Sequence, residues 1–167
     1  MKKLSTIFSA LLIAVVLAMS AGCYVIKGQR MKDVKGTYEL TRYTRTNGKT
    51  NEVTDYLTTY DYKVYLVVTG EQQGYCIFSD HDTPAYYYAC TLSYVYDEED
   101  TDIIEYVSFT YNGEAQKFGV TKNGLNFSRP AIKISDKMAQ DGYDLKWKQV
   151  SDDTDLSYVE EIFGSLS

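Results

Sequence analysis

The chain has 167 residues, with 17 basic and 23 acidic side chains and a formal net charge of −6. This length predicts one domain with one hydrophobic core. The acidic balance argues against nucleic-acid binding, which requires clustered lysine and arginine to displace counterions from phosphates. The sequence has no Gly-x-Ser-x-Gly elbow, P-loop or His-Glu-x-x-His motif, and its single histidine, His81, lies in a turn-like segment. We therefore expect no enzyme, metal site or cofactor.

The N-terminus has the three regions of a secretory signal peptide. Two lysines precede an apolar stretch around Leu11 to Met19, which is too short to span a bilayer, and small residues follow before Cys23. The segment resembles the lipobox of bacterial lipoproteins, in which the cysteine sulfur receives diacylglycerol and becomes the mature N-terminus. The resemblance implies a cleaved signal peptide over 1–22 and a lipid-anchored, extracytoplasmic protein at the cell membrane. The alternative is an ordinary cleaved signal peptide with a coincidental cysteine.

Cleavage before Cys23 leaves 15 basic and 23 acidic side chains, a net charge of −8. Anionic headgroups repel such a surface, so we expect the acyl chains on Cys23 to hold the protein on the lipid bilayer. Residues 23–33 predict a short lipidated tether, and residues 34–167 predict the folded domain.

Alternation of apolar and polar side chains, the period of a half-buried strand, covers most of that domain. It predicts eight strands near residues 36–44, 62–68, 75–79, 85–96, 103–111, 114–121, 125–128 and 144–150. The polar segment 46–59 predicts a long loop, and residues 130–134 predict an irregular extension before the last strand.

Two Asn-Gly pairs predict tight hairpins, because type I′ turns need positive φ at both central residues. Asn112-Gly113 and Asn123-Gly124 each lie between strand-like runs. The registers of these turns place Val107 opposite Phe118 and Val120 opposite Phe127. One side then collects the predicted core face: Val107, Phe109, Phe118, Val120 and Phe127.

Cys76 and Cys90 flank a turn-like segment, Asp80 to Pro84. A hairpin centred on Thr83 places the two cysteines opposite each other, which predicts a disulfide in an oxidising compartment. Two buried, reduced thiols are an equally good interpretation, because cross-strand disulfide geometry is often strained.

Leu156, Val159 and Phe163 recur at helical spacing and predict one short C-terminal helix. We expect this helix to lie against the outside of the sheet, over Ile104 and Tyr106.

Eight short antiparallel strands avoid exposed edges most simply by closing into an up-and-down barrel, so the predicted fold class is all-β. The chain resembles lipocalin-like bacterial lipoproteins in strand order, in the helix after the last strand and in Gly36-Thr37-Tyr38, where the family usually has Gly-x-Trp. The resemblance covers about Val34 to Gly164. It implies that Lys146 or Lys148 packs over the Tyr38 ring at the closed end of the barrel.

Two functions fit such a barrel. A hollow barrel favours capture of one small apolar or amphipathic ligand, whereas a filled barrel favours a surface lipoprotein that binds another protein. The chain has 17 tyrosines, although their high strand propensity explains most of them. The residues expected to line a ligand cavity are Phe78, Tyr88, Leu92, Phe109, Phe118 and Trp147.

Overall fold

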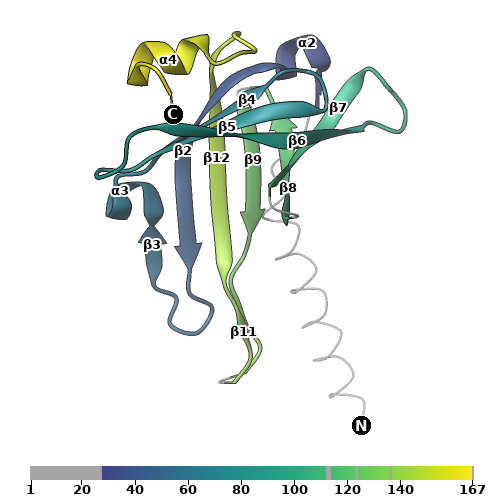
Figure 1. Ribbon diagram of the computed structural model, residues 1–167. Helices are drawn as coiled ribbons and strands as arrows, with labels where there is room; N and C mark the ends of the chain where they lie inside the picture. The colour runs from purple at the N-terminus through teal and green to yellow at the C-terminus, as the bar shows by residue number, and fades with distance from the viewer. Residues whose placement is uncertain (1–27, 112–113, 123, 136, 167) are drawn as a thin grey trace.

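The computed structural model describes residues 28–111, 114–122, 124–135 and 137–166. Eight antiparallel strands close into an up-and-down barrel with a short C-terminal helix, which confirms the predicted fold class. Each strand pairs with the next along the chain, and β12 returns to β2 to complete the circuit (Figure 1). The barrel strands are β2 (Gly36–Thr46), β4 (Lys63–Val68), β5 (Gln73–Ser79), β6 (Tyr86–Tyr96), β7 (Ile103–Tyr111), β8 (Glu114–Thr121), β9 (Gly124–Arg129) and β12 (Gly142–Ser151).

The two ends of the barrel differ. At one end, here the closed end, β1 (Gln29–Arg30) pairs with β7, and α2 (Met31–Val34) buries Val34 among the interior side chains. The opposite end, here the open end, carries four short elements: β3 (Val53–Asp55), α3 (Tyr56–Tyr60), β10 (Ile132–Lys133) and β11 (Ala139–Gln140). Figure 1 shows the β10–β11 hairpin projecting at the end away from α2.

The structure corrects two predictions for segments outside the barrel. Residues 46–59 do not form a plain loop, because β3 pairs with β2 and the Asp55 carboxylate caps α3 by accepting the Leu57 N–H at 3.0 Å. The tether predicted over 23–33 is folded from Gly28 onward, and residues 23–27 lie outside the described residues. Elements this short show too few periods for alternation to reveal them.

The β7–β8 register is the predicted one, with Val107 opposite Phe118. Asn112-Gly113 itself lies outside the described residues, between the paired strand ends. The β8–β9 register differs, since Val120 lies opposite Leu125 and not Phe127.

That shift arises because Thr121 pairs directly with Gly124, which places the connection one residue earlier than the Asn-Gly pair predicts. Asn123 lies outside the described residues. A shift of two in the pairing preserves which side each residue faces, because side chains alternate with period two. The predicted core face is therefore confirmed: Val107, Phe118 and Val120 are buried inside, and Phe109 and Phe127 pack against them.

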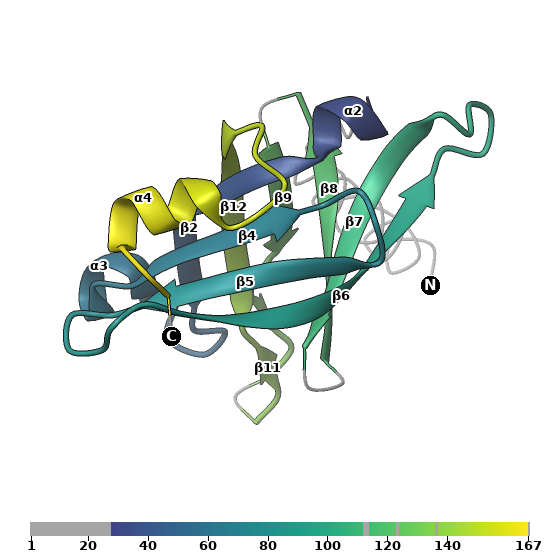
Figure 2. The same ribbon diagram turned by 45° about the horizontal axis from the view of Figure 1, so that its top comes forward.

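A second hydrophobic cluster lies outside the barrel, under α4 (Ser157–Phe163). Val159 is fully buried against Tyr65, Val67 and Ile77 of β4 and β5. Figure 2 shows α4 lying along this side of the barrel.

The prediction that the helix covers Ile104 and Tyr106 is wrong. Ile104 belongs to the interior cluster, and the Tyr106 ring is covered by Lys117 Nζ at 4.0 Å from its centroid. The physical reason is reach: β12 neighbours β2, which neighbours β4, so the short connection 152–156 carries the chain to β4 and not across to β7.

Candidate functional site

The open half of the barrel encloses a cavity of about 570 Å³. Strand alternation directs one side chain in two inward, so every barrel strand contributes to the wall. The lining residues are Leu40, Tyr43, Tyr62, Val64, Cys76, Phe78, Tyr88, Phe109, Gln116, Phe118, Phe127, Arg129, Tyr143, Leu145 and Trp147.

The cavity has a filled floor. Leu40, Cys76, Phe118 and Trp147 are buried, and beyond them the closed half is packed with side chains such as Leu66, Leu92 and Val107. The barrel is thus hollow at one end and filled at the other.

Four aromatic rings, two of them in the floor, pack against one another. Phe109 and Phe118 stack with centroids 5.2 Å apart and an interplanar angle of 7°, and Trp147 stands at 89° to both at 6.1 Å. Phe127 contacts Phe118 edge-on at 6.1 Å. These offset and edge contacts are favourable ring geometries, so the floor has a defined shape. The buried Trp147 indole Nε1 has no hydrogen-bond partner among the residues that the structure describes.

A second set of rings forms what we call the aromatic rim. Successive ring contacts, with centroids 4.6 to 6.4 Å apart, join Tyr43, Tyr56, Tyr60, Tyr62, Phe78, Tyr86 and Tyr88. Four of these rings also line the cavity: Tyr43, Tyr62, Phe78 and Tyr88.

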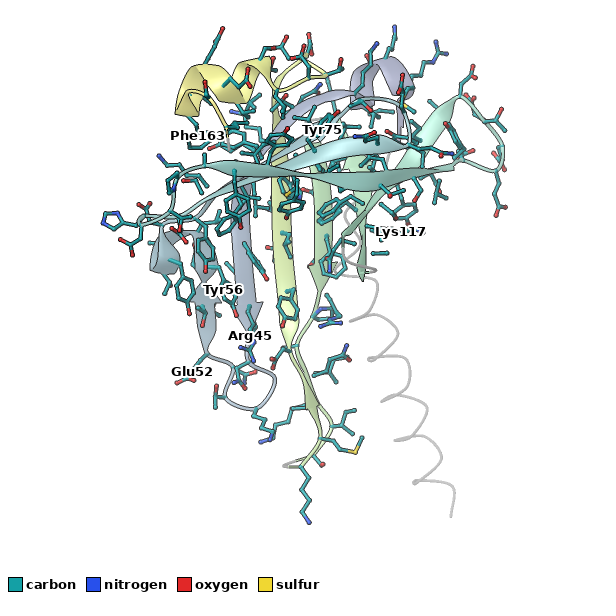
Figure 3. The ribbon with its side chains drawn as sticks, in the orientation of Figure 1. Arg45, Glu52, Tyr56, Tyr75, Lys117 and Phe163 are labelled. Atoms are coloured by element: carbon teal, nitrogen blue, oxygen red, sulfur yellow. The ribbon has the colours of Figure 1, made fainter. Side chains whose placement is uncertain are left out.

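The helical turn α3 completes this rim, because Tyr56 and Tyr60 are four residues apart and share one helix face. Figure 3 shows Tyr56, the first residue of α3, at the open end. The predicted loop over 46–59 did not include this contribution, although the Tyr-x-x-x-Tyr spacing after the capping Asp55 is the sequence signal for it.

Arg129 is the one charged residue among those that line the cavity. Its guanidinium carbon lies 5.1 Å from the centroid of the Tyr143 ring, a cation–π contact. Two nearby carboxylates are already paired, Asp144 with Arg42 Nε at 2.9 Å and Asp141 with Arg45 Nε at 2.8 Å. Arg129 forms no ion pair with any carboxylate in the described part of the chain.

The structure brings together most of the residues predicted to line a cavity. Phe78, Tyr88, Phe109, Phe118 and Trp147 lie in its wall or floor. Leu92 lies instead below the floor, fully buried in the filled half. It points inward like the others but sits nearer the closed end, a position along the strand that alternation does not specify.

At the closed end the Tyr38 ring is buried, and its hydroxyl donates a hydrogen bond to the Val34 carbonyl of α2. The predicted lysine does not cover this ring. Leu145 and Trp147 point inward, so Lys146 and Lys148 point to the outer face. The residue opposite Tyr38 is Gln149, whose side-chain amide donates to the Lys35 carbonyl at 3.0 Å.

Gly36 allows the backbones of β2 and β12 to approach closely at the closed end. Its φ is +140°, and a Cβ there would lie 2.5 Å from the Ser151 carbonyl oxygen, so a larger residue would push β2 away from the end of β12. The neighbouring Thr37 hydroxyl donates to the Asp153 carbonyl at 2.9 Å, which also joins β2 to the segment after β12.

The two cysteines of the domain are free. The predicted register is wrong by two residues, because Cys76 lies opposite Tyr88 and Cys90 lies opposite Gly74. Both thiols are buried, which is the second of the two interpretations that the sequence left open. Burial raises the pKa of Cys76 to about 12 and that of Cys90 to about 11.

Comparison with protein-family models, curated proteins and solved structures finds no match to this chain. Within the described residues, no helix is both long and apolar enough to cross a membrane, and no group of three potential metal ligands gathers. Cys23 lies outside the described residues.

Proposed function

We propose that this protein is a lipid-anchored, extracytoplasmic lipoprotein whose lipocalin-like barrel binds one small apolar or amphipathic ligand. The observation that carries this proposal is the cavity of about 570 Å³ in the open half of the barrel. Pockets for small molecules commonly have volumes of about 300 to 1,000 Å³ and apolar or aromatic walls. The proposed role is binding and not catalysis.

The lining residues support an apolar ligand body. Nine of the fifteen are aromatic and only Gln116 and Arg129 carry an amide or a charge, both exposed at the mouth. A ligand that enters would exchange water for ring contacts along the wall and meet an amide or a charge only near solvent. The filled half supports the floor, so the cavity need not reorganise for binding.

A ligand titration with the single tryptophan as reporter tests this function. Trp147 lies in the floor, so a bound apolar compound should change its emission saturably. The cavity-filling variant Val64→Phe should abolish this response, whereas Ile134→Ser in the exposed β10–β11 segment should keep it. A response that is unchanged by Val64→Phe, or no response to any compound in a panel of lipids and aromatic molecules, would contradict the proposal.

The anchor needs its own test. Cells that express the chain should incorporate labelled palmitate into it, and Cys23→Ala should remove the label and release the protein from membranes. Retention of the label in Cys23→Ala would contradict acylation at Cys23.

A second function, binding of another protein, is favoured by one specific observation. Large apolar side chains are exposed around the open end, including Val53 (65% exposed), Ile134 (67%) and Met138 (59%). Exposed apolar residues gathered in one region often mark an interface. Ile134→Ser would weaken such a contact without changing ligand binding in the cavity, so the same variant separates the two functions.

A further inference from the structure

We infer that the ligand is an amphiphile with one anionic head, held by Arg129 at the mouth while its apolar body lies against the aromatic walls toward Trp147. This inference rests on the proposed ligand-binding function and specifies the chemical class of the ligand. It depends on the charges that surround the mouth.

The first step is that Arg129 is available to a ligand. Arg129 is the last residue of β9, is exposed, and lines the cavity. It contacts the Tyr143 ring, which occupies one face of the guanidinium. After the Gly48 N–H and Arg45, its charge also contributes to the lowered pKa of Asp141. A guanidinium that stacks on a ring keeps its N–H donors in the plane of the group, directed away from the ring. These donors form the fork that matches a carboxylate, sulfate or phosphate.

The second step is that the neighbouring carboxylates are held by other groups. Asp141 accepts from Arg45 and, through its second oxygen, from the Gly48 N–H at 2.9 Å. Asp144 Oδ2 is paired with Arg42, whereas its Oδ1 is buried and has no hydrogen-bond partner among the described residues. Neither aspartate lines the cavity, and no carboxylate is among its lining residues. An anionic head at Arg129 therefore meets no buried negative charge in the wall.

An anionic head suits Arg129 better than a neutral or a cationic one. A neutral head beside Arg129, such as a hydroxyl, can accept hydrogen bonds from the guanidinium but brings no opposite charge. A cationic head would add repulsion. An anionic head adds charge attraction to these hydrogen bonds, and its two oxygens match the two-pronged geometry of the guanidinium.

The rest of the surface does not explain such a preference. The chain carries a net charge of −6, and other carboxylates near the open end, such as Asp55, Asp61 and Asp82, are exposed on the α3 side or in the β5–β6 turn. Long-range electrostatics therefore disfavours anions, and screening by salt weakens that repulsion. A preference for anions would have to come from the local contact at Arg129.

The test uses two ligands that differ only in the head, ω-bromododecanoic acid and ω-bromododecanol. Bromine quenches tryptophan at short range, so saturable quenching of Trp147 reports the apolar end near the floor. At pH 8 we expect the acid to bind at least about tenfold more tightly than the alcohol, the difference of one good charge-assisted contact. Isothermal titration calorimetry on the same samples checks the affinities.

Arg129→Gln should weaken the acid to the level of the alcohol and leave the alcohol unchanged. Arg129→Lys should restore part of the preference because it keeps the charge but loses the fork. Lys137→Gln is the matched control, an exposed cation near the same end but outside the lining, and should keep the full preference.

The outcomes distinguish failure of the anionic-head inference from failure of the proposed ligand-binding function. If both ligands bind equally well, the ligand-binding function stands and the inference of an anionic head is overturned. If Arg129→Gln weakens both ligands by the same factor, Arg129 supports the mouth structurally and the inference is likewise overturned. If neither ligand quenches Trp147 nor gives heat, the proposed function itself fails. Circular dichroism and the midpoint of thermal unfolding confirm that each variant is folded.

Discussion

Arg45 and Asp141 lie 96 positions apart in the sequence and are joined by two hydrogen bonds from the guanidinium Nε and Nη2 to one carboxylate oxygen. The other oxygen of Asp141 accepts the Gly48 N–H at 2.9 Å. The aspartate thus ties the end of β2 to the segment that leads into β12, and it holds the open end of the barrel together beside the mouth. Figure 3 shows Arg45 at this end.

Asp141→Ala should lower the thermal unfolding midpoint at pH 7. It should also make that midpoint less sensitive to a fall in pH. The Gly48 N–H, and then Arg45, hold the pKa of Asp141 below its usual value of about 3.9. A lowered folded-state pKa stabilises the fold above the unfolded-state pKa, and this stabilisation is lost as the pH falls through the folded-state value. Unfolding midpoints measured from pH 6 to pH 2 should fall less steeply in the variant. Asp82→Ala, in the exposed β5–β6 turn, is the control, and an acid profile of Asp141→Ala identical to that of the parent protein would contradict the prediction.

Tyr38→Phe should destabilise the domain by about 0.5 to 1.5 kcal/mol, because the buried Val34 carbonyl loses its hydrogen-bond donor. Burial raises the pKa of Tyr38 far above 10. A raised folded-state pKa contributes stability that is complete below about pH 10 and declines as the pH rises above it, because the unfolded tyrosine ionises first. Urea unfolding from pH 8 to pH 11.5 should show a smaller alkaline loss for Tyr38→Phe. The exposed Tyr60→Phe should behave like the parent protein.

The thiols of Cys76 and Cys90 should resist alkylation in the native protein at pH 8. Burial and the raised pKa values leave almost no thiolate at that pH. In denaturant without reductant, both should take up iodoacetamide, as peptide mass mapping would show. Failure of both to react in denaturant until reductant is added would indicate a disulfide and contradict the structure.

Phe163→Ala should lower the free energy of unfolding by about 1 to 3 kcal/mol, less than the loss of a fully buried phenylalanine. Its ring packs edge-on against Tyr65 at 5.7 Å and helps α4 to cover the outer face of β4 and β5. Figure 3 shows Phe163 beneath α4. Ile162→Ala, on the exposed side of the same helix, should cost less than about 0.5 kcal/mol. Equal effects of the two variants in urea unfolding would show that α4 is not held through this face.

The sequence alone determined the eight barrel strands, their antiparallel succession and the inward face that carries Val107 and Phe118. These features are local, because a few consecutive residues are enough to specify period-two alternation or a hairpin turn. Alternation also selected inward-facing residues such as Phe109 and Trp147 as cavity candidates, but it could not separate them from Leu92, which points the same way at a different height.

The tertiary structure decided the features that depend on residues far apart in the chain. The pairing of Cys76 with Tyr88 depends on how the β5–β6 turn packs, and the position of α4 depends on which strand lies within reach of the end of β12. The charge pattern at the mouth likewise depends on Arg42 and Arg45 meeting Asp144 and Asp141 across β2 and β12, which leaves Arg129 facing the cavity. A residue's partner across a barrel is set by how the whole sheet closes, and no local pattern in the sequence encodes which residues that closure pairs.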